Sequence, residues 1–120
     1  VQDKLVLESI VHPLVAQEIQ RRIMTSPAHC LVFDIPLLVE SSHWRAQLDR
    51  IVVVDCSAST QIRRVERRNG WHRTQIEAVI SNQCTRLQRL AVADTVLLND
   101  IDDLNVLEGL VAQSAHQFGL

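Results

Sequence analysis

Three short apolar runs constrain the fold of this chain more than any other feature of its sequence. They span Cys30–Asp34, Arg50–Asp55 and Thr95–Leu98, and each is apolar over almost its whole length. Strands that lack polar alternation are typical of parallel sheets, in which helices cover both faces. The runs therefore predict three strands of a buried parallel sheet.

Helical patterns fill the segments around these runs. Apolar residues recur at helical spacing over Leu5–Met24, where Pro13 marks a helix start or a kink. After the second strand, Ser57 is a candidate N-cap and Gly70 a candidate helix end. Acidic residues that suit a helix N-terminus open an amphipathic segment that runs from Asp102 to about Phe118.

Two capping-box patterns predict further helix starts between the second and third strands. Thr74-x-x-Glu77 predicts one start, and Thr85-x-x-Gln88 predicts a short helix that runs to about Ala93. The expected order of elements is α–β–α–β–α–α–α–β–α. This alternation predicts the α/β class, with helices layered on both sides of a parallel sheet and an all-helical insertion between the second and third strands.

Composition restricts the functional classes to which the chain can belong. The 120 residues are 47% hydrophobic, as expected of one globular domain or a large piece of one. The longest apolar runs fall far short of the roughly 20 residues that a membrane span requires. A net charge of −2 argues against a generally basic nucleic-acid binder. The three cysteines form no Cys-x-x-Cys pair, so we expect buried free thiols and a cytoplasmic protein.

The arginines are concentrated in one segment of the chain. Residues 59–93 contain seven arginines, two acidic residues and no lysine, whereas residues 94–120 contain five acidic residues and neither Lys nor Arg. Arginine binds phosphate or carboxylate in a planar, bidentate manner that lysine cannot reproduce. Residues 59–93 are therefore a candidate phosphate-binding region, and a solvated helical face is the alternative.

Two of the predicted strands end in an aspartate, Asp34 and Asp55. Ligands of open parallel sheets bind beyond the carboxyl ends of the strands, where an aspartate can hold Mg²⁺ through water or orient a substrate. Alternatively, the aspartate caps the next helix or accepts hydrogen bonds from loop amides. The structural role is favoured for Asp55, which lies two residues before Ser57, and both roles stay open for Asp34.

Four motifs follow one another along the chain. They are L-E-x-x-x-H-P at Leu7–Pro13, D-x-P-L-L-x-E at Asp34–Glu40, V-V-D followed by Q-x-x-R-x-x-x-R within Val53–Arg68, and Q-x-x-R-x-x-R-L-x-x-A-D-x-V-x-x-N at Gln83–Asn99. This ordered set resembles the dephospho-CoA kinase family. Because the motifs cover nearly the whole chain, the resemblance rests on the set rather than on any single block.

The resemblance implies a P-loop kinase-like, three-layer α/β/α fold and a transfer of the γ-phosphoryl group of ATP to the ribose 3′-hydroxyl of dephospho-CoA. This reaction is the last step of coenzyme A synthesis. The implied ligands are ATP and dephospho-CoA, and Mg²⁺ is the implied metal, without an assigned ligand in this chain. Residues 1–120 correspond to the C-terminal portion of such a domain, and residues 57–92 to a helical lid that closes over the nucleotide.

The matched positions also imply site residues. Arg86 is the first candidate for contact with the ATP phosphates and for catalysis, and Arg64 and Arg68, four residues apart on one helix face, are second candidates. Asn99 matches a position near the adenine, where its amide could donate and accept, or it is a turn residue at a strand end. His12 is equally explained as an ordinary residue near a helix start. The residues expected near dephospho-CoA are Asp34, Leu37, Leu38 and His12.

The phosphate loop of such kinases is missing from the sequence. The chain has three glycines, Gly70, Gly109 and Gly119, and its one lysine, Lys4, follows none of them, so no G-x-x-x-x-G-K-S/T pattern is present. The first residue is Val and not Met. We therefore expect a chain that lacks the N-terminal part of the enzyme and is inactive alone. We also expect it to associate with itself, or with the missing part, through an uncovered sheet edge.

Two other functions remain open from the sequence alone. One is another nucleoside or nucleotide P-loop kinase, whose acceptor site would differ around residues 34–40. The other is a non-catalytic module whose arginine-rich helices bind an anion or a nucleic acid. Two Trp, two Phe and no Tyr give little support for base stacking, so neither a nucleic acid nor a membrane is an expected partner.

Overall fold

Two units, Val1–Asp34 and Ile35–Leu120, make up the chain in a computed structural model. The structure describes the backbone of residues 2–40 and 42–120, and the side chains of residues 6, 7, 9–40 and 44–120. Among the residues that it describes, no helix has the length and apolar character needed to cross a membrane.

Unit 1 consists of a long helix, α1 (Gln2–Thr25), and the chain that follows it. The helix continues through Pro13, so the proline does not start it. Its last turn closes where the Thr25 hydroxyl donates to the Arg21 carbonyl oxygen at 2.9 Å. On its surface, hydrogen bonds from Arg21 and Arg22 lower the pKa of Glu18 to about 2.

The prediction of a strand at Cys30–Asp34 is wrong, because these residues have no regular secondary structure. A strand needs a neighbour that exchanges main-chain hydrogen bonds with it. In the part of the chain that the structure describes, strand pairing is confined to two other segments, 52–55 and 95–98. Cys30 is exposed, contrary to expectation, whereas Cys56 and Cys84 are half-buried, and all three thiols are free.

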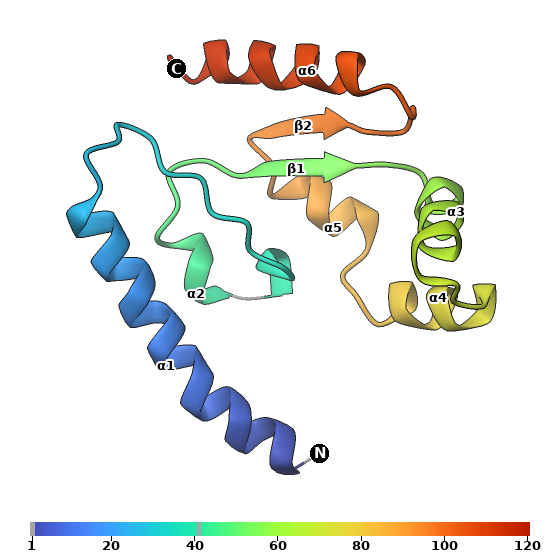
Figure 1. Ribbon diagram of the computed structural model, residues 1–120, viewed down its shortest axis with the longest axis horizontal. Helices are drawn as coiled ribbons and strands as arrows, with labels where there is room; N and C mark the ends of the chain where they lie inside the picture. Colours follow the sequence, from blue (N-terminus) through green and yellow to red (C-terminus); the bar gives the residue numbers. More distant parts are fainter. Residues whose placement is uncertain (1, 41) are drawn as a thin grey trace. The chain divides into compact units, whose positions relative to one another are not determined.

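Unit 2 contains two strands and a series of shorter helices, seen in Figure 1. In chain order its elements are the 3₁₀ turn η1 (Leu38–Glu40), α2 (Ser42–Arg45), β1 (Val52–Asp55), α3 (Ala58–Asn69), α4 (Arg73–Ser81), α5 (Arg86–Ala91), β2 (Thr95–Leu98) and α6 (Leu104–Gln117). The α/β class is thus confirmed, in a mostly helical form with a small sheet.

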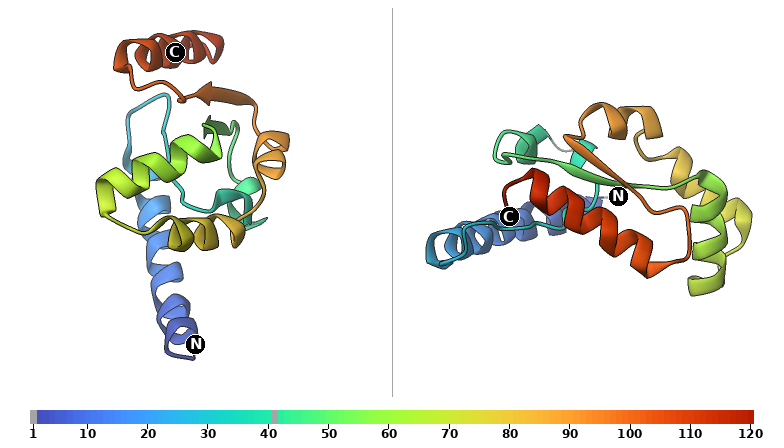
Figure 2. Two further views of the ribbon diagram at one scale, coloured as in Figure 1. Left: turned by 90° about the vertical axis from the view of Figure 1, so that its right-hand side faces the viewer. Right: turned by 90° about the horizontal axis from the view of Figure 1, so that it is seen from above.

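The two strands are parallel, with Val52 opposite Thr95 and Asp55 opposite Leu98. At the start of the pair, the Asp94 carboxylate accepts a 2.7 Å hydrogen bond from the Ile51 amide. At the end, the Asn99 amide donates to the Asp55 carbonyl oxygen at 2.8 Å. Both strands therefore run in one direction and end at the same edge, and α3 begins beyond that edge (Figures 1 and 2).

Local capping signals explain where most helices of this unit begin and end. The Ser57 hydroxyl caps α3, and Gly70 ends it in the left-handed conformation, with φ at 66°. Thr85 and Gln88 form the predicted capping box of α5. A helix start near Thr74 is confirmed, because α4 begins at Arg73, but its N-cap is His72 and not Thr74.

The Gln75 side chain takes the place that sequence reasoning gave to Glu77. Its Oε1 accepts the His72 amide hydrogen at 3.1 Å, which is the reciprocal half of a capping box. Glu77 instead pairs with Arg73 one turn away, at 2.8 Å. An N-cap histidine was not recognised because Ser, Thr, Asp and Asn are the residues usually found there.

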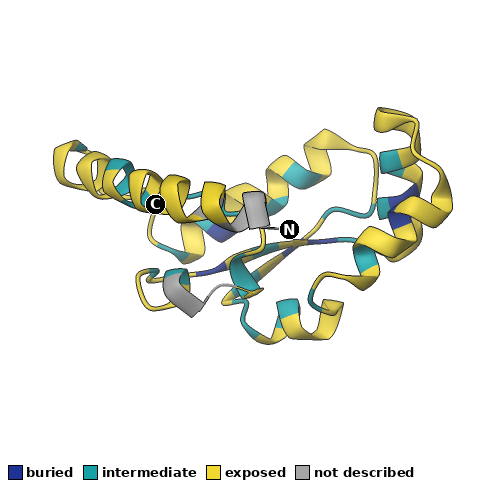
Figure 3. Ribbon diagram, turned by 90° about the horizontal axis from the view of Figure 1, so that it is seen from below, coloured by how far each residue is buried: buried dark blue, intermediate teal, exposed yellow. Residues whose placement is uncertain are grey.

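Burial in the described residues is limited, as Figure 3 shows. The buried hydrophobic side chains are Ile51, Ile62, Ile76 and Leu97. Helix α6 packs along β2, yet Val54 and Leu98 of the strands remain 60% and 54% exposed. The expectation that helices cover both faces of the sheet is therefore not met in these residues, because α6 packs along β2 while apolar side chains of both strands stay exposed.

Candidate functional site

Arg86 and Asp55 form a paired site where β1 ends. Arg86 is the first residue of α5, and its Nε lies 3.0 Å from each carboxylate oxygen of Asp55. Nη2 of the same guanidinium donates to Asp55 Oδ2 at 2.5 Å. The Asp55 side chain is 4% exposed, whereas the Arg86 side chain is 54% exposed. The carboxylate of the pair is therefore buried, whereas its arginine is open to solvent.

The electrostatics of the pair favour its charged form. The hydrogen bonds from Arg86 lower the pKa of Asp55, and they raise the pKa of Arg86 in turn. Asp55 therefore stays ionised at neutral pH despite its burial. A structural role was favoured for Asp55, with a loop amide as the expected hydrogen-bond donor. The donor to its side chain is instead an arginine 31 residues away.

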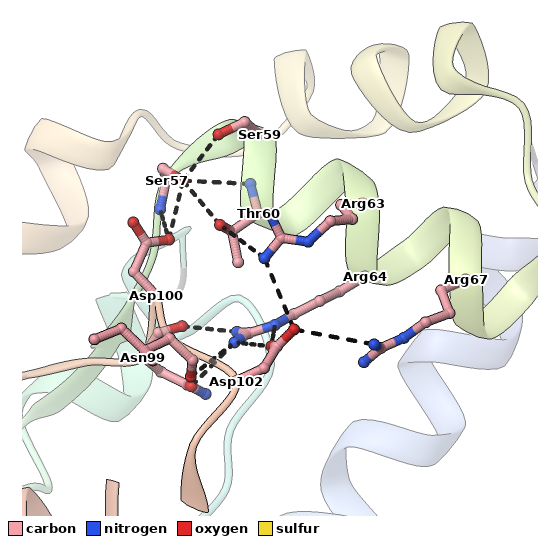
Figure 4. A network of polar contacts seen from close by, with 10 residues as sticks. Ser57, Ser59, Thr60, Arg63, Arg64, Arg67, Asn99, Asp100 and Asp102 are labelled. Carbon is pink, nitrogen blue, oxygen red and sulfur yellow. Dashed lines mark hydrogen bonds and ion pairs between the residues drawn. The ribbon is translucent and has the colours of Figure 1, made fainter. Parts of the chain in front are cut away.

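Arg64 of α3 reaches the loop that follows β2. Its Nη1 donates to the Asn99 carbonyl oxygen at 2.7 Å, and Nη2 lies 3.3 Å from Asn99 Oδ1. The same guanidinium bonds Asp102 Oδ1 through Nε at 3.1 Å and through Nη2 at 2.8 Å (Figure 4). Arg64 therefore ties helix α3 to residues 99–102.

Asp102 also faces the two neighbouring arginines of α3, as Figure 4 shows. Its Oδ2 lies 3.9 Å from both Arg63 and Arg67. Both arginines nevertheless remain more than half exposed. The hydrogen bonds from Arg64 lower the pKa of Asp102, and this hydrogen bonding raises the pKa of Arg64.

A third contact joins the same two segments at the start of α3. The Asp100 carboxylate accepts from the Ser57 amide and from the Ser57 hydroxyl, each at 2.9 Å. These hydrogen bonds, led by that of the Ser57 amide, lower the pKa of Asp100. The N-cap of α3 is therefore held by the loop after β2, which fixes where the arginine face of the helix lies (Figure 4).

Arg64 and Arg68 share a groove with a volume of about 780 Å³, lined by α3 and α4. Trp71 and Ile76 contribute apolar surface to it, and Gln83 adds a polar side chain. Arg68 also bonds the side chain of its neighbour Asn69 at 2.8 Å. A groove with cationic and apolar walls could accept an anion that carries an aromatic or aliphatic group.

The predicted nucleotide residues thus fall into two groups. Arg86, Asp55, Asn99 and Arg64 form one connected network through the ends of β1 and β2. Among the residues that the structure describes, Arg68 has no recorded hydrogen bond to that network, and it lines the groove together with Arg64. Asn99 directs its carbonyl and its side-chain oxygen to Arg64, which leaves the side-chain nitrogen Nδ2 without a recorded partner in the described residues.

The residues predicted near the acceptor belong to both units. His12 and Asp34 are exposed residues of unit 1, and Leu37 and Leu38 belong to unit 2. Leu37 is 56% exposed and has a φ of 56°, a left-handed conformation that is unusual for leucine. Their role in acceptor binding stays a prediction.

Glu40, the last residue of that motif, has a defined partner across unit 2. Its Oε1 accepts from the Cys84 amide at 2.9 Å, which lowers the pKa of Glu40. Burial raises the pKa of the Cys84 thiol. The acceptor motif is therefore tied to the residue just before the capping box of α5.

The described residues do not gather a set of metal-binding side chains for the implied Mg²⁺. Among them, no three His, Cys, Asp or Glu side chains gather closely enough to hold a metal ion. The two carboxylates at the strand ends already accept hydrogen bonds, Asp55 from Arg86 and Asp100 from Ser57. We assign no metal ligand in these residues.

Comparison with known proteins decides the family. A family model described as Dephospho-CoA kinase matches residues 1–104. The chain belongs to the dephospho-CoA kinase family. This result confirms the family resemblance of the four motifs.

Individual members of the dephospho-CoA kinase family match almost the whole chain. Dephospho-CoA kinase of Albidiferax ferrireducens is 48% identical over 117 residues, which are 95% of this chain and 55% of the relative. Dephospho-CoA kinase of Burkholderia lata is 48% identical over 111 residues, which are 92% of this chain and 54% of the relative. The chain thus spans about half the length of the dephospho-CoA kinases that it matches.

A solved structure supports the fold. The crystal structure of TT1252 from Thermus thermophilus matches with a TM-score of 0.81 and 29% sequence identity. The match covers 97% of this chain and 61% of that one.

Sequence reasoning missed Asp102 as a partner of the arginines. The signal was present as a segregation of charge, with arginines in residues 59–93 and acids without Lys or Arg in residues 94–120. Segments of opposite charge attract, but periodicity and spacing do not say which arginine meets which acid 38 residues away.

Proposed function

We propose that residues 1–120 contribute the lid and parts of the adenine and acceptor sites to a cytoplasmic dephospho-CoA kinase. The enzyme transfers the γ-phosphoryl group of ATP to the ribose 3′-hydroxyl of dephospho-CoA, giving coenzyme A and ADP. The lid is assigned to residues 57–92, and the whole domain to the three-layer, P-loop kinase-like fold. Mg²⁺ accompanies the nucleotide as the family implies, and no ligand for it is assigned in this chain.

One observation carries this proposal. Arginines from two helices, Arg64 of α3 and Arg86 of α5, are held beside the carboxyl ends of the parallel strands β1 and β2. In open α/β sheets this edge is where ligands bind. Phosphoryl transfer depends mainly on positioning and on charge stabilisation, and guanidinium groups supply both.

Each candidate residue has a defined role in this proposal. Arg86 stabilises negative charge on the transferred group, and Arg64 and Arg68 provide positive potential along α3. The side-chain nitrogen Nδ2 of Asn99 is available as a donor to the adenine, since the side-chain oxygen accepts from Arg64. The acceptor side is formed by His12, Asp34, Leu37 and Leu38.

The test is an assay of the protein produced from its complete reading frame. ATP and dephospho-CoA should give ADP and coenzyme A in equal amounts, measured by chromatography of the coenzyme. Adenosine, AMP and other nucleotides offered as acceptors should be poor substrates. Efficient phosphorylation of one of them, with none of dephospho-CoA, would reject the proposed acceptor in favour of another P-loop kinase.

The 120-residue chain alone serves as the matched control. It contains no G-x-x-x-x-G-K-S/T pattern, so we expect no turnover from it.

A further inference from the structure

We propose that Asp55 is a positioning residue for Arg86. In this role Asp55 holds one edge of the guanidinium group, so that the opposite edge is presented to a phosphate of the nucleotide. The proposal rests on the proposed function, because it takes Arg86 as the arginine that contacts the nucleotide. It goes beyond that function by assigning a task to a residue that does not itself touch substrate.

The geometry of the contact divides the guanidinium into two edges. Nε and Nη2 of Arg86 both donate to the Asp55 carboxylate. Nη1 has no recorded hydrogen bond to the described residues. A planar, five-donor group can serve two acceptors at once when each takes a different edge. The arginine side chain is 54% exposed, so the remaining edge is accessible to a ligand.

Both partners are held in place by their own main chains. Asp55 is the last residue of β1, and its carbonyl oxygen accepts from the Asn99 amide at 2.8 Å. Arg86 is the first residue of α5, directly after the Thr85 N-cap and its capping box with Gln88. The carboxylate therefore sits on a strand and the arginine on a capped helix start, which fixes the two main-chain positions that the ion pair joins.

The placement of Arg86 is unfavourable without Asp55. The N-terminus of a helix carries partial positive charge, which repels a cation in its first turn. A nearby anion offsets this repulsion, and for Arg86 that anion is Asp55. Local conflicts of this kind concentrate at functional sites.

The competing explanation is that the Asp55–Arg86 salt bridge only stabilises the fold. A substitution of Asp94, another strand-end carboxylate, is the control for a loss of stability alone. Asp94 accepts from the Ile51 amide at the opposite end of β1, and no arginine contact to its side chain is recorded in the described residues. Asp94→Asn should lower thermal stability and leave kcat and the KM for ATP unchanged.

The experiment measures kcat and KM for ATP in the protein from the complete reading frame. Arg86→Ala should lower kcat/KM by about tenfold or more. Asp55→Asn, which keeps size but loses the charge, should lower kcat/KM by about threefold to tenfold. When Asp55→Asn is added to Arg86→Ala, kcat/KM should not fall further, because Asp55 acts only through Arg86. An equal loss in both backgrounds, or no loss in the folded single variant, would overturn the proposal.

Arg86→Lys keeps the test decisive if Asp55→Asn does not fold. Lysine retains the charge, but as a single ammonium group it cannot hold a carboxylate on one edge and a phosphate on the other. We expect it to lose nearly as much activity as Arg86→Ala. Full activity of Arg86→Lys would overturn the positioning role and leave the proposed function intact. A wild-type protein that does not phosphorylate dephospho-CoA would overturn the proposed function and this proposal with it.

Discussion

At the scale of single residues, the arginines of α3 differ sharply in what they contact. Arg64 makes direct hydrogen bonds to Asn99 and Asp102, and its side chain is 26% exposed. Arg67 is 75% exposed and approaches Asp102 only to 3.9 Å. Exposed ion pairs at such a distance contribute little, so a count of arginines overstates how many matter.

Arg64→Ala should therefore impair nucleotide binding much more than Arg67→Ala. Loss of Arg64 frees the carbonyl and side-chain oxygens of Asn99 and loosens residues 99–102. We expect the KM for ATP to rise by about threefold to tenfold with a smaller change in kcat, because the affected residues bind and do not react. Steady-state kinetics of both variants provide the measurement. Equal effects of the two substitutions would contradict the assignment.

The carboxylates of this network predict a dependence of stability on pH. In the folded protein the pKa of Asp55, Asp100 and Asp102 is lowered from the ordinary value of 3.8. Their stabilisation is complete above that value and is lost as pH falls through the lower folded pKa values. The melting temperature should thus change little as the pH decreases toward about 4, and it should fall at lower pH.

Asp55→Asn provides the comparison for this pH profile. The variant has a lower melting temperature at neutral pH but should lose less stability on acidification, because one of the titrating groups is gone. Scanning calorimetry over pH 2 to 7 would test both statements. A variant whose acid limb is as steep as that of the wild type would show that Asp55 is not among the groups responsible.

At the scale of secondary-structure elements, sequence reasoning succeeded where the deciding information is local. The strand Thr95–Leu98 and the caps at Ser57, Gly70 and Thr85 are confirmed. Cys30–Asp34 has a strand-like composition, but a strand also depends on a neighbour, which composition does not reveal. The Arg86–Asp55 contact joins residues 31 positions apart and depends on how β1 and α5 pack, so the motif match gave the arginine but not its partner.

Replacement by alanine should have opposite effects on stability at two glycines, one at the end of a helix and one inside a helix. Gly70 ends α3 with φ at 66°, a conformation that costs alanine about 1 kcal/mol. Gly109 lies inside α6, and a Cβ added there would meet no atom within 4 Å. Gly70→Ala should destabilise the protein by about 1 kcal/mol, and Gly109→Ala should stabilise it by about 0.5–1 kcal/mol. Thermal unfolding of the two variants checks both signs, and a stabilised Gly70→Ala would contradict the left-handed cap.

At the scale of the whole molecule, the exposed apolar surface is the dominant feature. Although 47% of the residues are hydrophobic, the buried hydrophobic side chains among the described residues are Ile51, Ile62, Ile76 and Leu97. Both strands keep apolar side chains in contact with solvent, among them Val54 and Leu98. Surfaces of this kind favour association, particularly along strands.

The 120-residue chain alone should therefore associate in a concentration-dependent manner. Sedimentation velocity at increasing concentration should show a growing share of oligomers. Val54→Lys places a charge on the 60% exposed strand position and should shift the distribution toward smaller species. A monodisperse chain that unfolds cooperatively at low concentration would contradict this expectation.

The parallel pairing of β1 with β2 also constrains the order of folding. Val52 and Thr95 are partners, so their pairing must close a loop that includes α3, α4 and α5. Closing a flexible loop of that length costs entropy, and forming those helices first makes the loop shorter and stiffer. Arg64 meets Asn99 and Asp102 only beyond the end of β2. A nascent chain therefore lacks this half of the site until residues 95–102 have been synthesised.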